Sequence, residues 1–282
     1  MITSLTLLIL SLVALYIGAG WLVQGSSALA LKAKISPLVV GLTIVAFGTS
    51  APELVVSLNA TLSGQGDIAI GNIVGSNIFN IGVILGVSAT ICPLQVKKQL
   101  LRIDIPVMLA ATVLFTILFW NGTLGRTEGL FFLTGIIIYT IFSLFYSRKH
   151  GTEGSSQELE EQPKHWAVDT LAIVGGLVVL VFASRLLVDN AVSIAKELGV
   201  SEAVIGLTIV AAGTSMPELA TSIVAAYKRK TDIAIGNIVG SNLFNILTIA
   251  GSCSLIHPIE AKNVNYIDLL VCWAYPSCSC RW

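Results

Sequence analysis

The sequence has little charge, few cysteines and few histidines. Only 11% of its 282 residues are charged, 55% are hydrophobic, and the mean hydropathy is +0.86. These values exclude an ordinary soluble domain, and runs of about 20 apolar residues are long enough to cross a bilayer as helices. We therefore expect an all-α polytopic membrane protein whose surroundings are a lipid bilayer.

The zero net charge, the few cysteines and histidines and the lack of catalytic motifs each exclude a class of function. The net charge is zero, so nothing indicates a nucleic-acid partner. Five scattered cysteines and three histidines form neither a disulfide framework nor a soft-metal ligand pattern. There is no phosphate-binding loop and no pairing of nucleophile and base. We therefore expect no enzyme, no cofactor and no obligate protein partner.

Apolar runs divide the chain into two halves. Helices are predicted near 4–24, 38–62, 67–91, 103–120, 127–147, 167–188, 203–226 and 232–256, with the start of a ninth at 267–272. The apolar run at 5–23 has no basic residue before it, so we interpret it as a retained helix and not as a signal peptide.

This division predicts the domains. They are a first repeat at 1–147, a polar cytoplasmic linker at 148–166, an incomplete second repeat at 167–272 and an atypical tail at 273–282. A second half as long as the first would continue past residue 282, so a C-terminal truncation or frameshift is the simplest explanation of this end. An inactive fragment is therefore one interpretation of the chain.

Lysine and arginine are unevenly distributed among the connections between these helices. Alternate loops, starting after the first helix, hold eleven of them, and the other loops hold three. The positive-inside rule then places the N-terminus outside. Because the first half has an odd number of helices, the second half enters the membrane from the opposite side. Such inverted repeats are typical of secondary transporters.

One stretch of 41 residues, 41–81, occurs twice. The second copy, 206–246, follows 165 positions later without a gap, and 28 of the 41 positions are identical. Both copies contain Gly-Thr-Ser-Xaa-Pro-Glu, at 48–53 and 213–218, and Gly-Asn-Ile-Val-Gly-Ser-Asn-Xaa-Phe-Asn, at 71–80 and 236–245. A carboxylate inside an apolar segment is a functional-site hypothesis by default. Two copies predict one site built from both halves.

The motif residues favour a hard cation. Pro52 and Pro217 each free the carbonyl four residues earlier, and in lipid a bound cation can satisfy such exposed groups. Oxygen-bearing side chains surround both breaks and line one face of each following helix: Thr49, Ser50, Glu53, Ser76, Asn80, Thr214, Ser215, Glu218, Ser241 and Asn245. Oxygen ligands without thiolate or imidazole suit calcium and sodium. Two glutamates balance one calcium or two sodium ions, which favours exchange over leak.

Other interpretations stay open for parts of the repeat. Glu53 and Glu218 can also be read as a purely structural hydrogen-bonded pair. Close helix packing is the interpretation for Gly71, Gly75, Gly236 and Gly240. Interhelical hydrogen bonds are expected for Asn72, Asn77, Asn237 and Asn242. Asp67 and Asp232 are interpreted as helix N-caps or as guards of an ion entrance.

The doubled motifs resemble the alpha repeats of sodium/calcium exchangers, in the cation/calcium exchanger superfamily, and the bacterial calcium/sodium antiporter type in particular. The resemblance extends from the first helix to about Cys272. It implies a ten-helix fold in which helices two, three, seven and eight hold the ions while helices one and six slide. It also implies that the ten side chains above are ligands, together with the backbone carbonyls of Ala46 and Ala211. Some relatives have aspartate where Asn245 stands, which leaves stoichiometry and proton coupling open.

The sequence therefore predicts a secondary active transporter in a bacterial inner membrane. It would exchange calcium for sodium by alternating access at one site near the bilayer midplane. A calcium/proton antiporter keeps the same fold with a different coupling ion. A channel is the alternative of another class, and an even, doubly acidic site without a pore-lining pattern argues against it.

Overall fold

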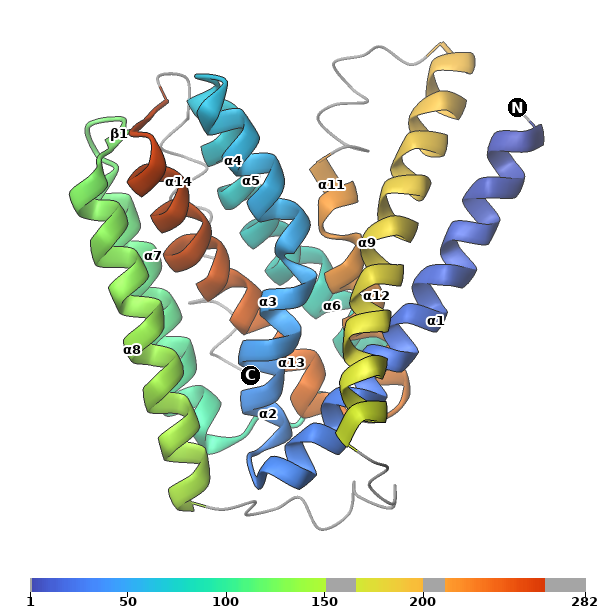
Figure 1. The fold of residues 1–282 in the computed structure, drawn as a ribbon, viewed down its shortest axis with the longest axis horizontal. Coiled ribbons are helices and arrows are strands. Elements are labelled where there is room, and N and C mark those ends of the chain that lie inside the picture. The colour runs from blue at the N-terminus through green and yellow to red at the C-terminus, as the bar shows by residue number, and fades with distance from the viewer. Residues whose placement is uncertain (1, 151–165, 200–210, 262–282) are drawn as a thin grey trace.

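Long helices account for almost all of the described residues (Figure 1). The structure, a computed structural model, describes residues 2–150, 166–199 and 211–261. The helices of the first half are α1 (Ile2–Ala33), α2 (Pro37–Val40), α3 (Ala46–Thr49), α4 (Ala51–Leu62), α5 (Gly66–Phe79), α6 (Gly86–Ile91), α7 (Ile105–Leu118) and α8 (Arg126–His150). Those of the second half are α9 (Trp166–Glu197), α11 (Ala211–Thr214), α12 (Met216–Tyr227), α13 (Thr231–Leu243) and α14 (Ala250–Ile256).

Within the described residues, four π-helical turns join some of these helices into longer rods. They are η1 (Gly41–Val45), η2 (Asn80–Leu85), η3 (Leu100–Asp104) and η5 (Phe244–Ile249). Such turns are rare and are often found at functional sites. η2 begins at Asn80 and η5 contains Asn245, so both predicted amide ligands lie where the helix widens.

The lengths of the helices fit a membrane protein. Among the described residues, six helices are long and apolar enough to span a bilayer: Thr3–Ala33, Gly66–Ile91, Leu100–Leu118, Arg126–Lys149, Trp166–Glu197 and Thr231–Ile256. The bent pair Pro37–Thr49 and Ala51–Leu62 makes a seventh if it is one span. The prediction of an all-α polytopic membrane protein is confirmed.

The first and sixth predicted helices are longer than the sequence indicated. They were expected to end near 24 and 188, where polar residues begin, but α1 continues to Ala33 and α9 to Glu197. The two helices pack closely along their length: a Cβ built at Gly18 would lie 2.9 Å from the Val179 side chain. Near the end of α1, Lys32 forms an ion pair with Asp169 of α9. Partner contacts of this kind allow the helices to carry polar residues further than hydropathy alone predicts.

The repeated sequence adopts the same backbone twice. Ser50 and Ser215 have φ/ψ of −85/9° and −86/10°, and Cys92 and His257 have −147/131° and −144/128°. The members of each pair are 165 positions apart. In Figure 1, α3 to α4 rises toward the top whereas α11 to α12 descends, so the two copies run in opposite directions.

Two short strands, which the sequence analysis did not predict, pair at one end of the bundle. β1 (Thr123–Leu124) and β2 (Ile259–Glu260) are antiparallel. Gly66 lies against them so closely that an added Cβ would be 2.0 Å from the Glu260 carbonyl oxygen. The connections that follow α4, α7 and α14 therefore meet at the same end of the molecule, as the predicted alternation of loops requires (Figure 1).

Several predicted segments lie wholly or partly outside the described residues. They are the linker from residue 151 to 165, the start of the helix near 203, the start of a ninth helix at 267–272 and the tail at 273–282. The domain boundaries that depend on these segments stay predictions.

Candidate functional site

Two matching helix breaks position the glutamates. In the first repeat the helix bends by 47° between Thr49 and Ala51. Glu53 and Glu218 lie in the first turns of α4 and α12, which begin directly after the breaks. Both side chains are 1% exposed. A helix N-terminus carries a partial positive charge, so each break supplies favourable electrostatics for a buried carboxylate.

Each carboxylate is held by the opposite repeat. Ser50 Oγ donates to Glu218 Oε1 at 2.7 Å, and Ser215 Oγ donates to Glu53 Oε1 at 3.0 Å. Ser215 Oγ also lies 3.3 Å from Ser76 Oγ. The structure therefore brings the two acidic motifs into one place, made by residues of both halves.

Four asparagine side chains form a network across the two repeats. Asn80 Nδ2 donates to Asn242 Oδ1 at 3.0 Å, and Asn245 Nδ2 donates to Asn77 Oδ1 at 2.9 Å. Asn77 Nδ2 in turn donates to the Asn242 carbonyl oxygen at 3.3 Å. These bonds use the amide nitrogens of Asn80 and Asn245. The predicted interhelical hydrogen bonds of Asn77 and Asn242 are confirmed.

A second pair of asparagines, Asn72 and Asn237, hydrogen-bonds to the helices that begin after the two breaks. Asn72 Nδ2 donates to the Glu53 carbonyl oxygen and to Ser57 Oγ, at 3.2 and 2.9 Å. Asn237 makes the same two bonds, to the Glu218 carbonyl oxygen at 3.4 Å and to Ser222 Oγ at 3.0 Å. The predicted interhelical role of Asn72 and Asn237 is therefore confirmed as well.

The same two asparagines accept hydrogen bonds from the motif threonines. Thr49 Oγ1 donates to Asn237 Oδ1 at 3.1 Å, and Thr214 Oγ1 donates to Asn72 Oδ1 at 3.5 Å. Thr49 Oγ1 is also 3.4 Å from the Ala46 carbonyl oxygen. These contacts connect the threonine of each motif to an asparagine of the opposite repeat.

Five oxygen or hydroxyl groups of this centre are buried without any hydrogen-bond partner among the described residues. They are Glu53 Oε2, Glu218 Oε2, Asn80 Oδ1, Asn245 Oδ1 and Ser241 Oγ. Buried polar atoms without partners are costly, and each one requires an explanation. Four of them form two pairs related by the sequence repeat, so the explanation has to involve both halves equally.

The chemistry of these atoms fits a hard cation. All five are oxygens, two belong to carboxylates, and calcium takes six to eight oxygen ligands in a flexible shell. Among the described residues there is no group of three or more His, Cys, Asp or Glu side chains that could hold a metal ion. A site built from few charges and many neutral oxygens is therefore the kind of site that these residues can form.

Two predicted carbonyl ligands are placed less completely. The Ala46 carbonyl oxygen, at the start of α3, accepts from the Ser50 backbone N–H at 3.0 Å and lies 3.4 Å from Thr49 Oγ1. Ala211 is the first residue of α11, and its side chain is outside the described part of the chain. Their roles as ligands stay predictions.

The glycines of the two copies differ in their surroundings. A Cβ at Gly236 would lie 2.6 Å from the Leu38 carbonyl oxygen, and one at Gly240 would lie 2.5 Å from that of Leu42. These two glycines let α13 approach α2 and η1, as predicted. None of the described residues comes within 4 Å of a Cβ at Gly71 or Gly75. Residues 203–207, which correspond in sequence to Leu38–Leu42, lie outside the described residues.

The interpretation of Asp67 and Asp232 as N-caps is wrong. The residue at the cap position of α5 is Gln65, and Asp67 lies inside the first turn. The residue at the cap position of α13 is Lys230, and Asp232 lies inside the first turn. Its carboxylate forms an ion pair with Lys97, which precedes η3. The aspartate therefore joins two connections at one end of the bundle.

Sequence analysis missed Ser184 of α9. Its hydroxyl donates to the Gly213 carbonyl oxygen at 2.7 Å, which is the carbonyl that Pro217 frees. The corresponding residue of α1 is Ala19, so the repeat gives no signal for it. Ser57 and Ser222 were also not singled out, although they are identical in both copies and the repeat could have revealed them.

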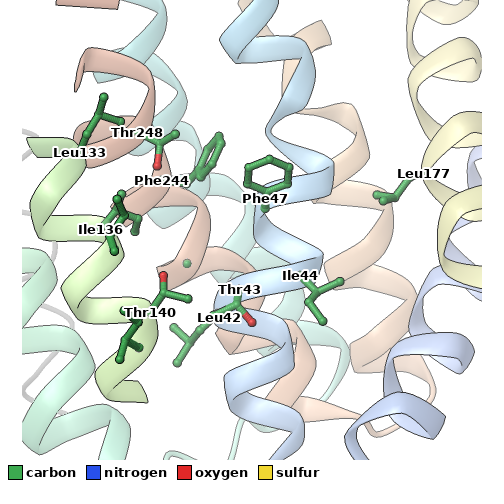
Figure 2. Close-up of a pocket in the computed structure, with 13 residues that line it drawn as sticks. Leu42, Thr43, Ile44, Phe47, Leu133, Ile136, Thr140, Leu177, Phe244 and Thr248 are labelled. Atoms are coloured by element: carbon green, nitrogen blue, oxygen red, sulfur yellow. The ribbon is translucent and has the colours of Figure 1, made fainter. Parts of the chain in front are cut away.

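A separate cavity of about 680 Å³ lies beside this centre and is lined mainly by apolar side chains of η1, α3, α8 and η5. Figure 2 shows the rings of Phe47 and Phe244 close together at its upper part, and their centroids are 5.0 Å apart. An apolar lining cannot replace the hydration shell of a cation. The cavity is therefore distinct from the oxygen-rich centre.

Comparisons with known proteins agree with this description. The family model "Sodium/calcium exchanger protein" matches residues 3–145 and 168–277. The inner membrane protein YrbG of Escherichia coli is 37% identical over 97% of this chain and 90% of its own length. A less similar relative, the Ca(2+)/H(+) antiporter ChaA of Bacillus subtilis, is 28% identical over 88% of this chain and 76% of its own length. A structure of the sodium-calcium exchanger NCX_Mj superimposes with a TM-score of 0.86 at 32% identity, over 99% of this chain and 90% of that one.

Proposed function

Because the chain belongs to the sodium/calcium exchanger family, we propose that it is an antiporter that moves calcium across a bacterial inner membrane in exchange for sodium. Family membership and the shared fold support cation and calcium exchange in general. We further propose that sodium is the coupling ion, that the ions bind between the two repeats, and that the N-terminus lies outside.

The observation that carries the proposal is the set of unpartnered oxygens between the two repeats. A cation there would satisfy all of them at once. We assign as ligands Glu53, Glu218, Asn80, Asn245, Ser50, Ser215, Ser76, Ser241, Thr49 and Thr214, with the carbonyl oxygens of Ala46 and Ala211. Their hydrogen bonds hold many of these oxygens in place before an ion arrives, which lowers the cost of binding.

The charge of the site explains exchange. When both glutamates are ionised they balance one calcium or two sodium ions, so either load leaves the site neutral. The empty site carries two buried negative charges, which is expensive in a medium of low dielectric constant. A loaded site can therefore change its accessibility more easily than an empty one, which couples the two ions.

Proton coupling is the second candidate. Protons on Glu53 and Glu218 would also leave the site neutral, and the relative ChaA is named a calcium/proton antiporter. The two candidates share the site and differ only in the ion that drives calcium. An experiment with separately imposed gradients distinguishes them.

In the proposed membrane orientation, the N-terminus of the protein lies outside. The lysine- and arginine-rich loops would then face the cytoplasm. In Figure 1 the N-terminus lies at the same end as the connections after α4 and α7, which hold few basic residues. Modification of single cysteines placed in these loops, in intact cells, would test the orientation.

Isotope flux tests the function. The full-length chain in liposomes is given an outward sodium, potassium or proton gradient in turn, and uptake of radioactive calcium is followed. We expect uptake only with the sodium gradient, and its loss in Glu53→Gln and Glu218→Gln, which keep side-chain size but remove the charge. Uptake driven by protons without sodium would replace sodium by the second candidate. Uptake that ignores all three gradients would contradict exchange.

Calcium binding has an independent readout. A ligand that binds only the folded state raises its stability, by about 2.7 kcal/mol at a hundredfold excess over Kd. We expect calcium to raise the unfolding temperature of the detergent-solubilised protein. Glu53→Gln should abolish this increase, whereas Lys98→Gln, which changes the charge of an exposed residue just before η3, should keep it.

A further inference from the structure

We propose that Asp104 is a proton-binding site inside the membrane, separate from the exchange site, and that loss of its proton sets the alkaline limit of transport. The inference starts from an acid that the duplicated motif does not contain. Asp104 lies outside the 41-residue repeat, and the comparable acid of the second half, Asp268, follows 164 and not 165 positions later. The aspartate is therefore not one of the ligands that the duplicated motif supplies.

Asp104 is completely buried at the end of the π-helical turn η3. Tyr139 of α8 donates its hydroxyl hydrogen to Asp104 Oδ1 at 2.9 Å, while Asp104 Oδ2 has no hydrogen-bond partner among the described residues. The buried acids Asp169 and Asp232 each form an ion pair with a lysine. Asp104 has no such pair in the described part of the chain, so no protein cation balances its charge.

A second unpartnered oxygen lies nearby. Ser143 follows Tyr139 by one turn of α8, and its buried Oγ has no hydrogen-bond partner among the described residues. Two such oxygens are too few for calcium, which needs about six. A proton needs only one. We therefore assign a proton to this site, since a buried carboxylate with no cation beside it is expensive to ionise.

The charged and titratable groups around Asp104 do not change this conclusion. α7 packs against η3, α13 and η5, and its side chains also contact α8. η5 has no titratable residue, α13 has only Asp232, which is paired with Lys97, and Arg102 of η3 is exposed. Besides Tyr139, the titratable residues of α8 lie toward its two ends: Arg126, Glu128, Tyr146, Arg148, Lys149 and His150.

A short path connects Asp104 to the exchange site. Met108 is one turn further along on the same face, and Asn242 Nδ2 donates to its sulfur at 3.7 Å. Asn242 Oδ1 accepts the hydrogen bond that orients Asn80. Ionisation of Asp104 would draw water toward this face of the helix and displace Met108, which disturbs the amide network. Exchange should therefore decline when the proton leaves.

Infrared spectroscopy tests the proton directly. The Glu53→Gln/Glu218→Gln variant removes the carboxyl groups of the exchange site, and Asp104→Asn is added to it. We expect the difference spectrum at neutral pH to show the loss of one protonated-carboxyl band, which titrates away at alkaline pH. Asp232→Asn, which removes a lysine-paired acid, should cause no such loss. No band for Asp104, or a band that appears only when sodium is withdrawn, would overturn the proposal.

The flux measurement tests the consequence and rests on the proposed function. Calcium uptake is recorded against pH for the wild type, Asp104→Asn and Tyr139→Phe. Asp104→Asn keeps the acceptor for Tyr139 but cannot ionise, so its alkaline decline should disappear while the acid side is unchanged. An unchanged alkaline decline in Asp104→Asn would contradict the proposal. A protein without calcium uptake at any pH would contradict the proposed function and leave the infrared result standing.

Discussion

At the scale of single residues, the serines at the two helix breaks have an unusual role. Serine at the start of a helix normally accepts a hydrogen bond from a backbone N–H of the first turn. Ser50 and Ser215 make no such side-chain bond. Their hydroxyls instead donate to the carboxylate of the opposite repeat. They therefore stabilise the charged form of the glutamates at the expense of their own helices.

Ser50→Ala and Ser215→Ala should each weaken calcium binding. A hydrogen bond to a charged group contributes about 1.5–3 kcal/mol, so we expect the KM for calcium to rise about ten- to hundredfold. The measurement is calcium uptake against calcium concentration at a fixed sodium gradient. Ser11→Ala is the control, because Ser11 is also buried but bonds only to the Leu8 carbonyl of its own helix. An unchanged KM in both variants would remove the serines from the site.

The neighbours of Asn80 and Asn245 favour an amide over a carboxylate at these two positions. Both face the carbonyl oxygen of another asparagine, Asn242 Oδ1 and Asn77 Oδ1. An ionised aspartate at either position would bring two acceptors together without a hydrogen between them, which is unfavourable. The network therefore favours neutral amides at both positions, so that only the two glutamates would carry charge in the proposed site.

At the scale of helices, a break inside the membrane requires a substitute for the lost hydrogen bond. Pro217 leaves the Gly213 carbonyl without its helical donor, and the hydroxyl of Ser184 replaces it. This bond attaches α9 to the break between α11 and α12. Val188 of the same helix lies against Gly213, where an added Cβ would be 2.1 Å from its Cγ2. The sixth predicted helix thus contacts the motif directly.

Ser184→Ala should destabilise the protein, because it leaves a buried carbonyl without a donor. The expected cost is about 1–3 kcal/mol, seen as a lower unfolding temperature in detergent. Ser27→Ala is the matched control, since this buried serine bonds back to the Val23 carbonyl of its own helix. Equal effects of the two substitutions would show that the contact with the break has no special importance.

At the scale of the whole molecule, α1 and α9 form a pair beside the other helices (Figure 1). Gly18 and Gly176 permit close contact, because a Cβ at Gly176 would be 2.7 Å from the Gly18 carbonyl oxygen. Lys32 also lies over the Trp166 ring, 5.7 Å from its centroid, and pairs with Asp169. These contacts connect the two helices near the middle of α1 and at its end, so we expect them to move as a unit during transport.

Exchanging the charges of the Lys32–Asp169 ion pair tests whether this pair holds α1 and α9 together. Lys32→Asp alone places two acids together in a largely buried position, and breaking a buried pair costs about 3 kcal/mol or more. We expect calcium uptake to fall at least tenfold, and the double variant Lys32→Asp/Asp169→Lys to recover most of it. Lys98→Asp, an exposed change of the same charge, should have little effect. A double variant no better than the single one would show that the pair does not hold the helices together.

The sequence by itself determined the membrane fold, the doubled motif and the residue types of the site. Hydropathy sets the helices, and an exact spacing of 165 positions makes every duplicated functional residue visible. Such reasoning finds Glu53 and Glu218 because each is the other's copy. It cannot find Ser184, whose counterpart is Ala19, or Asp104, which lies outside the repeated stretch.

Only the tertiary structure decided how the residues pair. Ser50 donates its hydrogen bond to Glu218 of the opposite repeat and not to Glu53, which is three residues away in the sequence. The sequence cannot predict this, because it depends on how the two repeats pack against each other. It also does not say which oxygens stay without partners, since that is fixed only after every donor has found an acceptor. Hydrogen-bond satisfaction is a property of the assembled bundle, and it is what distinguishes the proposed ligands from the asparagines that hold them.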